Sequence, residues 1–193
     1  MDTTLPTERG LTVGNGSMIA AITTATGVTP DSAGKPAGDM FTQAAEELHS
    51  DRPLAVGDRL NTDIAGGVAA GIPSLMVITG ISGHKDLLTA DPAERPTYIA
   101  ADMMALFDPV DSSTPGPKAG WKAELTSDGV LQLSSVDGEV SGGSSEESLG
   151  GADLSQQARF SDRRSHDALL TAIAAAWEDG APAVTQVLSL IHI

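Results

Sequence analysis

The sequence predicts an α/β fold in which helices cover a parallel β-sheet in three layers. Helical and strand-like segments alternate between residues 14 and 100, and the strand-like segments are short, apolar and bounded by Gly or Pro. Such alternation is typical of parallel strands joined by right-handed helical crossovers. Since 193 residues suffice for one full domain and some additional structure, we expect a single α/β core.

Three helices are expected in the first part of the chain from apolar residues at helical spacing. The first covers residues 14–27, with Asn15 or Ser17 as its cap. The second follows Pro36, a residue type that the first turn of a helix tolerates, and the third covers residues 61–70. Glycines end the first and third helices, at Gly27 and Gly71.

Three short apolar segments are expected to be parallel strands: residues 54–57, 74–79 and 97–100. Lys35 lies just before the second helix, and Asp58 follows the first strand directly. Ligands of open α/β sheets bind at the carboxyl ends of the strands. We therefore expect both side chains to project from the same edge of the sheet.

The character of the chain changes after residue 107. Residues 108–120 hold three prolines and several small polar residues, as a linker does. A small α+β module is expected over residues 121–179, with a hairpin at the Asp-Gly pair 128–129. Residues 137–157, rich in Gly, Ser and Glu, are predicted to be disordered, and residues 165–179 to form an amphipathic helix.

The charge of the chain argues against two classes of partner. Against 26 acidic residues stand 11 basic ones, which gives a net charge of −15 and opposes binding to nucleic acid or to an anionic membrane. No apolar run approaches the roughly 20 residues that span a bilayer. There are no cysteines, and the first residues lack a signal peptide's basic start and apolar stretch. We expect a cytoplasmic protein.

Asp58 and Asp63 are the candidate metal ligands. They stand five residues apart across a strand-to-helix turn, so one carboxylate could bind a cation directly while the other lies beside it. Carboxylate oxygens are hard donors of the kind that Mg²⁺ prefers. A purely structural interpretation stays open, in which Asp58 belongs to a turn, Thr62 caps the helix and Asp63 is a favourable charge in its first turn.

Lys35 is the candidate phosphate-binding cation. A flexible ammonium at the sheet edge could offer its charge to both a phosphate and a carboxylate nucleophile. A lysine in a turn is more commonly a solvated surface residue. The order Gly-Lys-Pro, helix, strand and Gly-Asp-Arg, with a second Asp five residues after the first, favours the functional interpretation.

The histidines and tryptophans have simpler interpretations. His49, His84 and His166 have no partner at the spacing of metal ligands, so we expect surface or capping roles. Trp121 and Trp177 are expected to anchor the small core of the C-terminal module.

Residues 2–107 resemble haloacid dehalogenase-type hydrolases of subclass IIA, which include 4-nitrophenylphosphatase-like and phosphoglycolate phosphatase-like enzymes with a large α/β cap. The motifs that carry the resemblance are Gly34-Lys35-Pro36, Gly57-Asp58-Arg59-Leu60-Asn61-Thr62-Asp63-Ile64 and Thr79-Gly80-Ile81-Ser82. It implies a Rossmann-like core. It also implies that Asp58 binds Mg²⁺, that Asp63 binds or orients the ion, and that Lys35 stabilises the nucleophile and the phosphate.

The same resemblance implies that this chain is a fragment. Residues 1–30 are similar to the end of the cap, and residues 31–107 to the C-terminal half of the core. The family's nucleophile, in an Asp-x-Asp motif, and its phosphate-binding Ser or Thr have no counterpart here. We therefore expect Met1 to be an internal methionine, and the nucleophile to be absent from this chain.

The last six residues are a separate case. Residues 188–193, Leu-Ser-Leu-Ile-His-Ile, resemble the translation of the mosaic-end adapter used in transposon-based sequencing libraries. We expect them to be an artefact, and we place no function on His192.

The parent protein is therefore expected to be a Mg²⁺-dependent phosphatase of small phosphorylated metabolites that works through an aspartyl-phosphate. A homodimer of the full-length protein is compatible with this expectation. The chain alone should be inactive, because losing a covalent nucleophile costs on the order of a millionfold in turnover. The alternative is a non-catalytic α/β module that binds Mg²⁺ or a regulatory partner at the same acidic edge.

Overall fold

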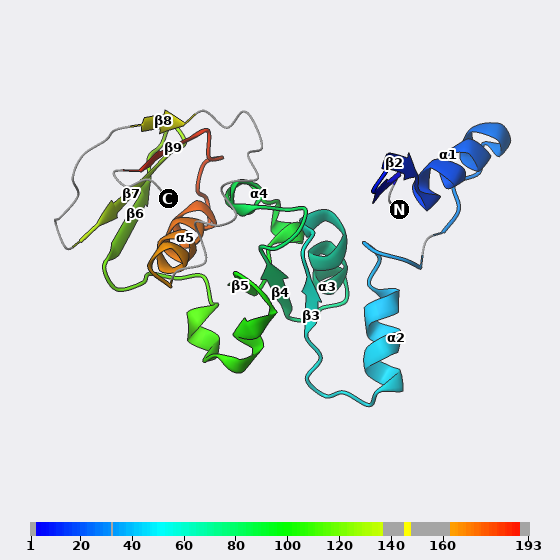
Figure 1. Cartoon of the computed structure of the whole chain (residues 1–193), viewed down its shortest axis with the longest axis horizontal. Coiled ribbons are helices and arrows are strands. Elements are labelled where there is room, and N and C mark those ends of the chain that lie inside the picture. Colours follow the sequence, from blue (N-terminus) through cyan, green and yellow to red (C-terminus); the bar gives the residue numbers. More distant parts are fainter. Residues whose placement is uncertain (1–2, 32, 137–144, 148–162, 190–193) are drawn as a thin grey trace.

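The centre of the fold is a parallel sheet of three strands, in the order β3-β4-β5 (Figure 1). The computed structural model describes residues 3–31, 33–136, 145–147 and 163–189. The strands are β3 (Ala55–Gly57), β4 (Ser74–Val77) and β5 (Tyr98–Ala100). All three predicted strands are present, in parallel register, so the predicted α/β class is confirmed.

Short helices and helical turns precede, connect and follow these strands. They are α2 (Asp39–Glu47), α3 (Ala65–Ala69), α4 (His84–Leu88) and the 3₁₀ turns Pro92–Glu94, Met103–Phe107 and Val110–Ser112. The predicted helix 61–70 is divided, because a π-helical turn, Leu60–Ile64, precedes α3. Phe41 of α2 lies against Gly66 of α3. Within the described ranges, no helix is both long and apolar enough to cross a membrane.

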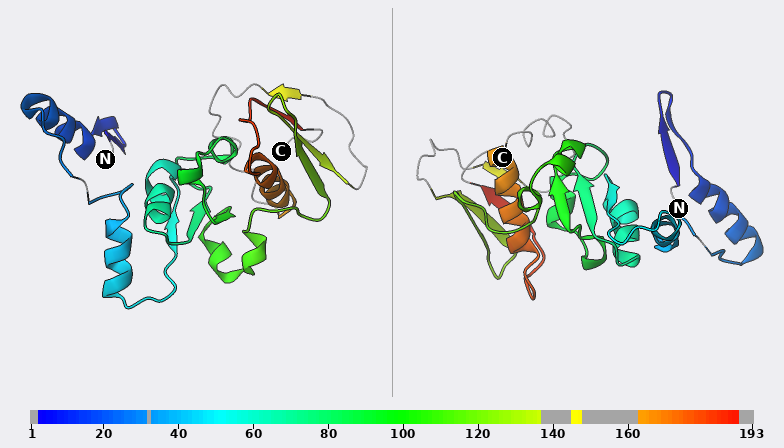
Figure 2. Two further views of the ribbon diagram at one scale, coloured as in Figure 1. Left: turned by 180° about the vertical axis from the view of Figure 1, so that it is seen from behind. Right: turned by 90° about the horizontal axis from the view of Figure 1, so that it is seen from below.

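The N-terminal segment stands apart from the central sheet in all views (Figures 1 and 2). It consists of an antiparallel hairpin, β1 (Thr4–Thr7) and β2 (Gly10–Val13), followed by α1 (Asn15–Thr26). The hairpin was not predicted. Gly27 ends α1 in the left-handed region as expected, but neither proposed side chain caps its start, since Gly14 is the N-cap and Ser17 Oγ donates to the carbonyl of Thr3.

The C-terminal module is a four-stranded sheet with one helix packed on it. The strand order is β6-β7-β9-β8, with β6 (Trp121–Leu125), β7 (Val130–Ser135), β8 (Ser145–Glu147) and β9 (Gln186–Ser189). The hairpin β6–β7 forms at the predicted Asp-Gly turn. The helix is α5 (Arg163–Ala176), which begins two residues before the predicted range 165–179 and ends three residues before its predicted end.

Two predictions from the sequence concern residues that the structure places partly in this module: the disorder of residues 137–157 and the adapter origin of residues 188–193. β8 lies inside residues 137–157, which we expected to be disordered, and the rest of that stretch lies outside the described residues. β9 includes Leu188 and Ser189, the first two residues of the expected adapter segment, whereas residues 190–193 are not described. The adapter interpretation stays a prediction.

One apolar core joins the central sheet to the C-terminal module. A single buried cluster contains Ile64, Met76 and Ile99 from the region of the central sheet and Leu131 and Ile173 from the C-terminal module. Each of these side chains is fully buried. Apolar burial at about 25 cal/mol per Å² is the main stabilising contribution in such a core. The two parts should therefore stabilise one another.

The segment 108–120 runs between these parts and is held by both. The amide of Ile99 donates to the carbonyl of Ser113 over 2.8 Å, and the amide of Lys118 donates to Thr171 Oγ1 over 3.1 Å. The amide of Gly116 donates to the carbonyl of Leu170. This segment, expected as a linker from its composition, thus has fixed partners in β5 and in α5.

Candidate functional site

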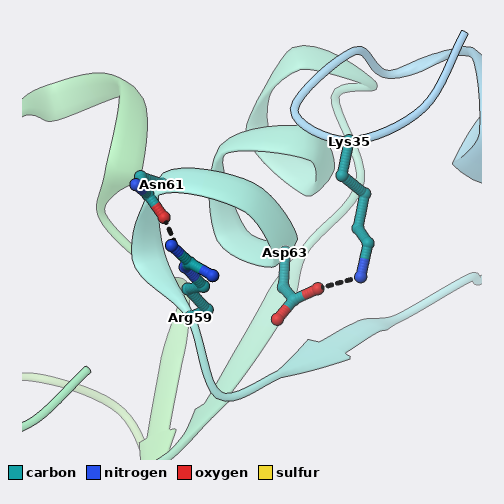
Figure 3. Close-up of polar contacts among 4 residues, drawn as sticks. All are labelled: Lys35, Arg59, Asn61 and Asp63. Atoms are coloured by element: carbon teal, nitrogen blue, oxygen red, sulfur yellow. Dashed lines mark hydrogen bonds and ion pairs between the residues drawn. The ribbon is translucent and has the colours of Figure 1, made fainter. Parts of the chain in front are cut away.

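Lys35 and Asp63 form an ion pair at the carboxyl edge of the central sheet (Figure 3). Lys35 Nζ lies 2.5 Å from Asp63 Oδ1. The Asp63 side chain is only 13% exposed, whereas that of Lys35 is 41% exposed. The carboxylate is therefore held inside the turn, and the lysine reaches it from the loop before α2 with part of its length in solvent.

The close approach of Asp63 to the strand depends on Gly57, the last residue of β3. A Cβ atom at position 57 would overlap the Asp63 side chain. The amides of Asp63 and Ile64 both donate to the carbonyl of Arg59, at 3.0 and 3.2 Å. This π-helical turn brings Asp63 back over the strand end, directly beside the residue that precedes Asp58.

Asp58 is held by the loop that follows β4. The amide of Ile81 donates to Asp58 Oδ2 over 3.3 Å, and the amide of Ser82 donates to the Asp58 carbonyl over 3.1 Å. The Ser82 hydroxyl accepts a hydrogen bond from the amide of Leu60 over 3.1 Å. Two neighbouring strand ends are thereby tied together at the same edge of the sheet.

The structural interpretation considered above is right for Asp63, which lies in the first turn of the π-helical segment, but wrong for Thr62 as the cap. Arg59, and not Thr62, is the N-cap of the turn, and it makes no side-chain capping bond. Thr62 is buried at 8% exposure. Arg59 Nε donates to Asn61 Oδ1 over 3.0 Å (Figure 3), and both residues line a hollow of about 370 Å³ whose other walls include Asp86 and Asp91.

The donor atoms present fit Mg²⁺ in kind but not in number. Asp58 and Asp63 offer carboxylate oxygens, which are the ligands that Mg²⁺ prefers, and the ion requires near-octahedral coordination. In the part of the chain that the structure describes, no group of three or more His, Asp or Glu side chains could hold a metal ion. A metal bound here would need water or further ligands to complete its shell.

The histidines lie elsewhere. His49 follows α2 in the left-handed region with φ of 49°, and His84 is the first residue of α4. His166 differs from its expected surface or capping role, because it is half-buried in α5 and lines a cavity of about 250 Å³. Burial lowers the pKa of His166 below its ordinary value, while the Ile99 backbone and the Asp167 charge oppose that shift.

The structure brings all three predicted site residues to one sheet edge. Lys35 contacts Asp63 directly, and Asp58 leaves the strand end over which Asp63 folds. Their roles toward a metal or a phosphate remain predictions. Sequence reasoning gave no role to Ser82, although a Gly-x-Ser sequence directly after a buried strand was visible.

Comparison with known proteins relates the central part of the chain to one family. Residues 32–106 match the profile of the HAD-hydrolase-like family. Residues 32–106 are therefore similar in sequence to the haloacid dehalogenase-like hydrolases. The matched segment contains the Lys35–Asp63 pair, the Asp58 loop and all three strands of the central sheet.

Several members of the family are similar in sequence. The D-glycerol 3-phosphate phosphatase of Mycobacterium tuberculosis is 49% identical over 125 residues, which cover 65% of this chain and 35% of that protein. A 5'-nucleotidase of Bacillus subtilis is 41% identical over 99 residues, covering 50% of this chain and 38% of the relative.

Solved structures of haloacid dehalogenase-like phosphatases share the fold. A glycerol phosphate phosphatase from Mycobacterium tuberculosis, in complex with magnesium, matches 97% of this chain and 49% of its own length, with a TM-score of 0.76 and 36% identity. The same protein has been solved with calcium. A 4-nitrophenylphosphatase from Thermotoga maritima matches 56% of this chain and 42% of its own length, with a TM-score of 0.51 and 34% identity. The chain thus spans about half or less of these relatives.

Proposed function

We propose that this chain is part of a Mg²⁺-dependent phosphomonoester hydrolase of subclass IIA that acts on small phosphorylated metabolites. One observation carries the proposal: the ion pair between Lys35 and Asp63 lies beside the residue that precedes Asp58, at the edge of the sheet where α/β proteins bind ligands. A lysine and two carboxylates at that edge are the groups that phosphoryl transfer requires besides its nucleophile.

Each of the three residues has a separate role in this proposal. Asp58 offers carboxylate oxygens to Mg²⁺, which when bound polarises a phosphoryl oxygen as a Lewis acid. Asp63, largely buried, holds the Lys35 ammonium in place. Lys35 presents its positive charge to the phosphate and to the nucleophile. This electrostatic stabilisation is stronger because the ammonium is already oriented before the substrate binds.

The nucleophile is proposed to come from residues outside this chain and to form an aspartyl-phosphate. The 193-residue sequence contains no two aspartates separated by a single residue. The described residues likewise offer no third metal-binding side chain beside Asp58 and Asp63. In this proposal residues 1–30 are the end of a cap, residues 31–107 are the C-terminal half of the core, and residues 121–179 are an additional module.

The substrate class follows from the relatives and from the charge. The relatives' names are those of phosphatases of glycerol phosphate and of nucleotides, so we assign a small phosphorylated metabolite here. The net charge of −15 disfavours nucleic acid and anionic membranes as partners, and we propose a cytoplasmic protein. A homodimer is a proposal for the full-length protein only.

Hydrolysis of 4-nitrophenyl phosphate by the purified chain tests whether the nucleophile is missing from this chain. With Mg²⁺ present, we expect no turnover above the buffer rate, because the nucleophile is missing and its loss costs on the order of a millionfold. An Asp58→Ala variant serves as the control for contaminating phosphatases. Turnover that copurifies with the chain and disappears in Asp58→Ala would show that the chain carries its own nucleophile.

A further inference from the structure

We propose that Ser82, acting with the backbone of Gly80 and Ile81, is a positioning residue for Asp58, and that it sets the affinity of the metal site. This inference rests on the proposed function, in which Asp58 binds the metal. Ser82 is 9% exposed, and its hydroxyl is directed at the backbone of residues 58–60, here called the aspartate loop.

Ser82 holds the aspartate loop at two points. Its amide donates to the carbonyl of Asp58, and its hydroxyl accepts from the amide of Leu60, each over 3.1 Å. Because these contacts lie on both sides of Arg59, they fix the backbone from which the Asp58 side chain leaves. Leu60 is 4% exposed, so water cannot readily replace the hydroxyl as the partner of its amide.

The Asp58 carboxylate is oriented by the loop that follows β4, residues 79–82. The Ile81 amide donates to Asp58 Oδ2 over 3.3 Å, which leaves the other carboxylate oxygen available to a cation. Gly80 makes this approach possible, since a Cβ atom at position 80 would overlap the carboxylate. Any side chain there would displace the carboxylate from its present position.

The loop between β4 and α4 is anchored at both ends. On one side it continues β4, whose four residues are all buried. On the other side the amide of Gly83 donates to Asp86 Oδ2 over 2.7 Å at the start of α4, and Trp177 Nε1 of the C-terminal module donates to the carbonyl of Leu87 over 2.9 Å. The loop is therefore a fixed support for Asp58.

Groups that orient a metal ligand through hydrogen bonds commonly change metal affinity by about 10–100-fold when they are removed. Ser82→Ala removes the acceptor for the Leu60 amide while the Asp58 carboxylate itself is retained. We expect an affinity loss of about tenfold, at the lower end of that range. Gly80→Ala should cost more, because it acts on the carboxylate directly.

Mn²⁺ titration of the 193-residue chain, followed by NMR, is the test. Mn²⁺ accepts the same oxygen ligands as Mg²⁺ and broadens nearby amide signals, so a weak site can be located and its affinity measured without activity. We expect the amides of Gly57, Asp58 and Ile81 to broaden first. The variants are Ser82→Ala, Gly80→Ala and the conservative Ser82→Thr, which keeps the hydroxyl.

The expected result is that Ser82→Ala needs about ten times more Mn²⁺ for half-broadening, that Gly80→Ala needs still more, and that Ser82→Thr restores the wild-type value. Thr79→Ala, which removes an exposed hydroxyl from the same loop, should behave as wild type. Should Ser82→Ala fail to fold, Gly80→Ala decides alone.

Two failures are distinguishable. If Asp58→Asn binds Mn²⁺ as the wild type does, the proposed function fails at its metal ligand. If Asp58→Asn loses the site while a folded Ser82→Ala, or Gly80→Ala where Ser82→Ala does not fold, keeps wild-type affinity, Asp58 needs no support from this loop, and only the present inference is overturned.

Discussion

The ammonium of Lys35 lies 2.5 Å from the Asp63 carboxylate, although 28 positions separate the two residues in the sequence. The ion pair joins the loop before α2 to the turn after β3. It therefore keeps the lysine near the end of β3, which Asp58 follows directly in the sequence.

Replacing Lys35 should have little effect on stability. The Lys35 side chain is 41% exposed, so water can take the place of its ammonium beside the 13% exposed Asp63 carboxylate, and ion pairs open to solvent contribute about 0–1 kcal/mol. For Lys35→Met we expect a loss below about 1 kcal/mol in urea unfolding. The matched control is Lys122→Met, which breaks the exposed pair with Glu124. A loss above about 2 kcal/mol for Lys35→Met alone would make the pair a structural element.

The contact between Trp177 and α4 should contribute measurably to stability. The indole donates to the Leu87 carbonyl over 2.9 Å, and the Arg95 guanidinium lies 5.4 Å from the ring centroid. A Trp177→Phe variant keeps an apolar ring but loses the hydrogen bond, at about 0.5–1.5 kcal/mol. Hydrogen exchange should show faster exchange of the α4 amides in this variant. Unchanged exchange there would mean that the module does not support α4.

The central sheet and the C-terminal module should unfold together. Ile173 of α5 is completely buried in the cluster that also contains Ile64 and Ile99. Ile173→Ala should cost about 2–5 kcal/mol and lower the unfolding midpoint of both parts, as followed by amide signals in β4 and in β7. Two separate transitions, with only the later part of the chain destabilised, would contradict a shared core.

Stability should fall as the pH drops below the ordinary pKa of histidine, through His166. Burial lowers the pKa of His166 in the folded chain, so the unfolded chain takes up a proton first. The stability present above about pH 6.5 is then lost as the pH falls through and below that value. His166→Leu should lose less stability than wild type between about pH 7.5 and 5.5. Identical losses in urea titrations would exclude this contribution.

Much of the fold could be predicted from local sequence patterns. The strands at 54–57, 74–79 and 97–100 were readable because short apolar runs bounded by Gly and Pro are typical of buried parallel strands. The hairpin at 128–129 followed from its Asp-Gly pair. The split of helix 61–70 was not readable, since the π-helical turn depends on how Asp63 packs against Gly57.

The remaining features depend on contacts between distant parts of the chain. The support that Ser82 gives to Asp58 joins residues from two strand ends, and no periodic pattern encodes it. The composition of residues 108–120 indicated a linker, because composition reflects only the backbone preferences of the segment. It could not predict the hydrogen bonds that Ser113 and Lys118 make with residues of β5 and α5. The same holds for Trp177, whose hydrogen-bond partner is 90 positions away.

We propose that Asp58 and Lys35 serve a phosphatase whose nucleophile lies outside this chain. The most direct measurement uses a chimera in which residues 32–106 replace the matching segment of the Mycobacterium tuberculosis D-glycerol 3-phosphate phosphatase. We predict Mg²⁺-dependent hydrolysis of 4-nitrophenyl phosphate by this chimera, reduced by at least about a hundredfold in Asp58→Ala and in Lys35→Ala. Full activity in a folded Asp58→Ala chimera would exclude the proposed role of Asp58.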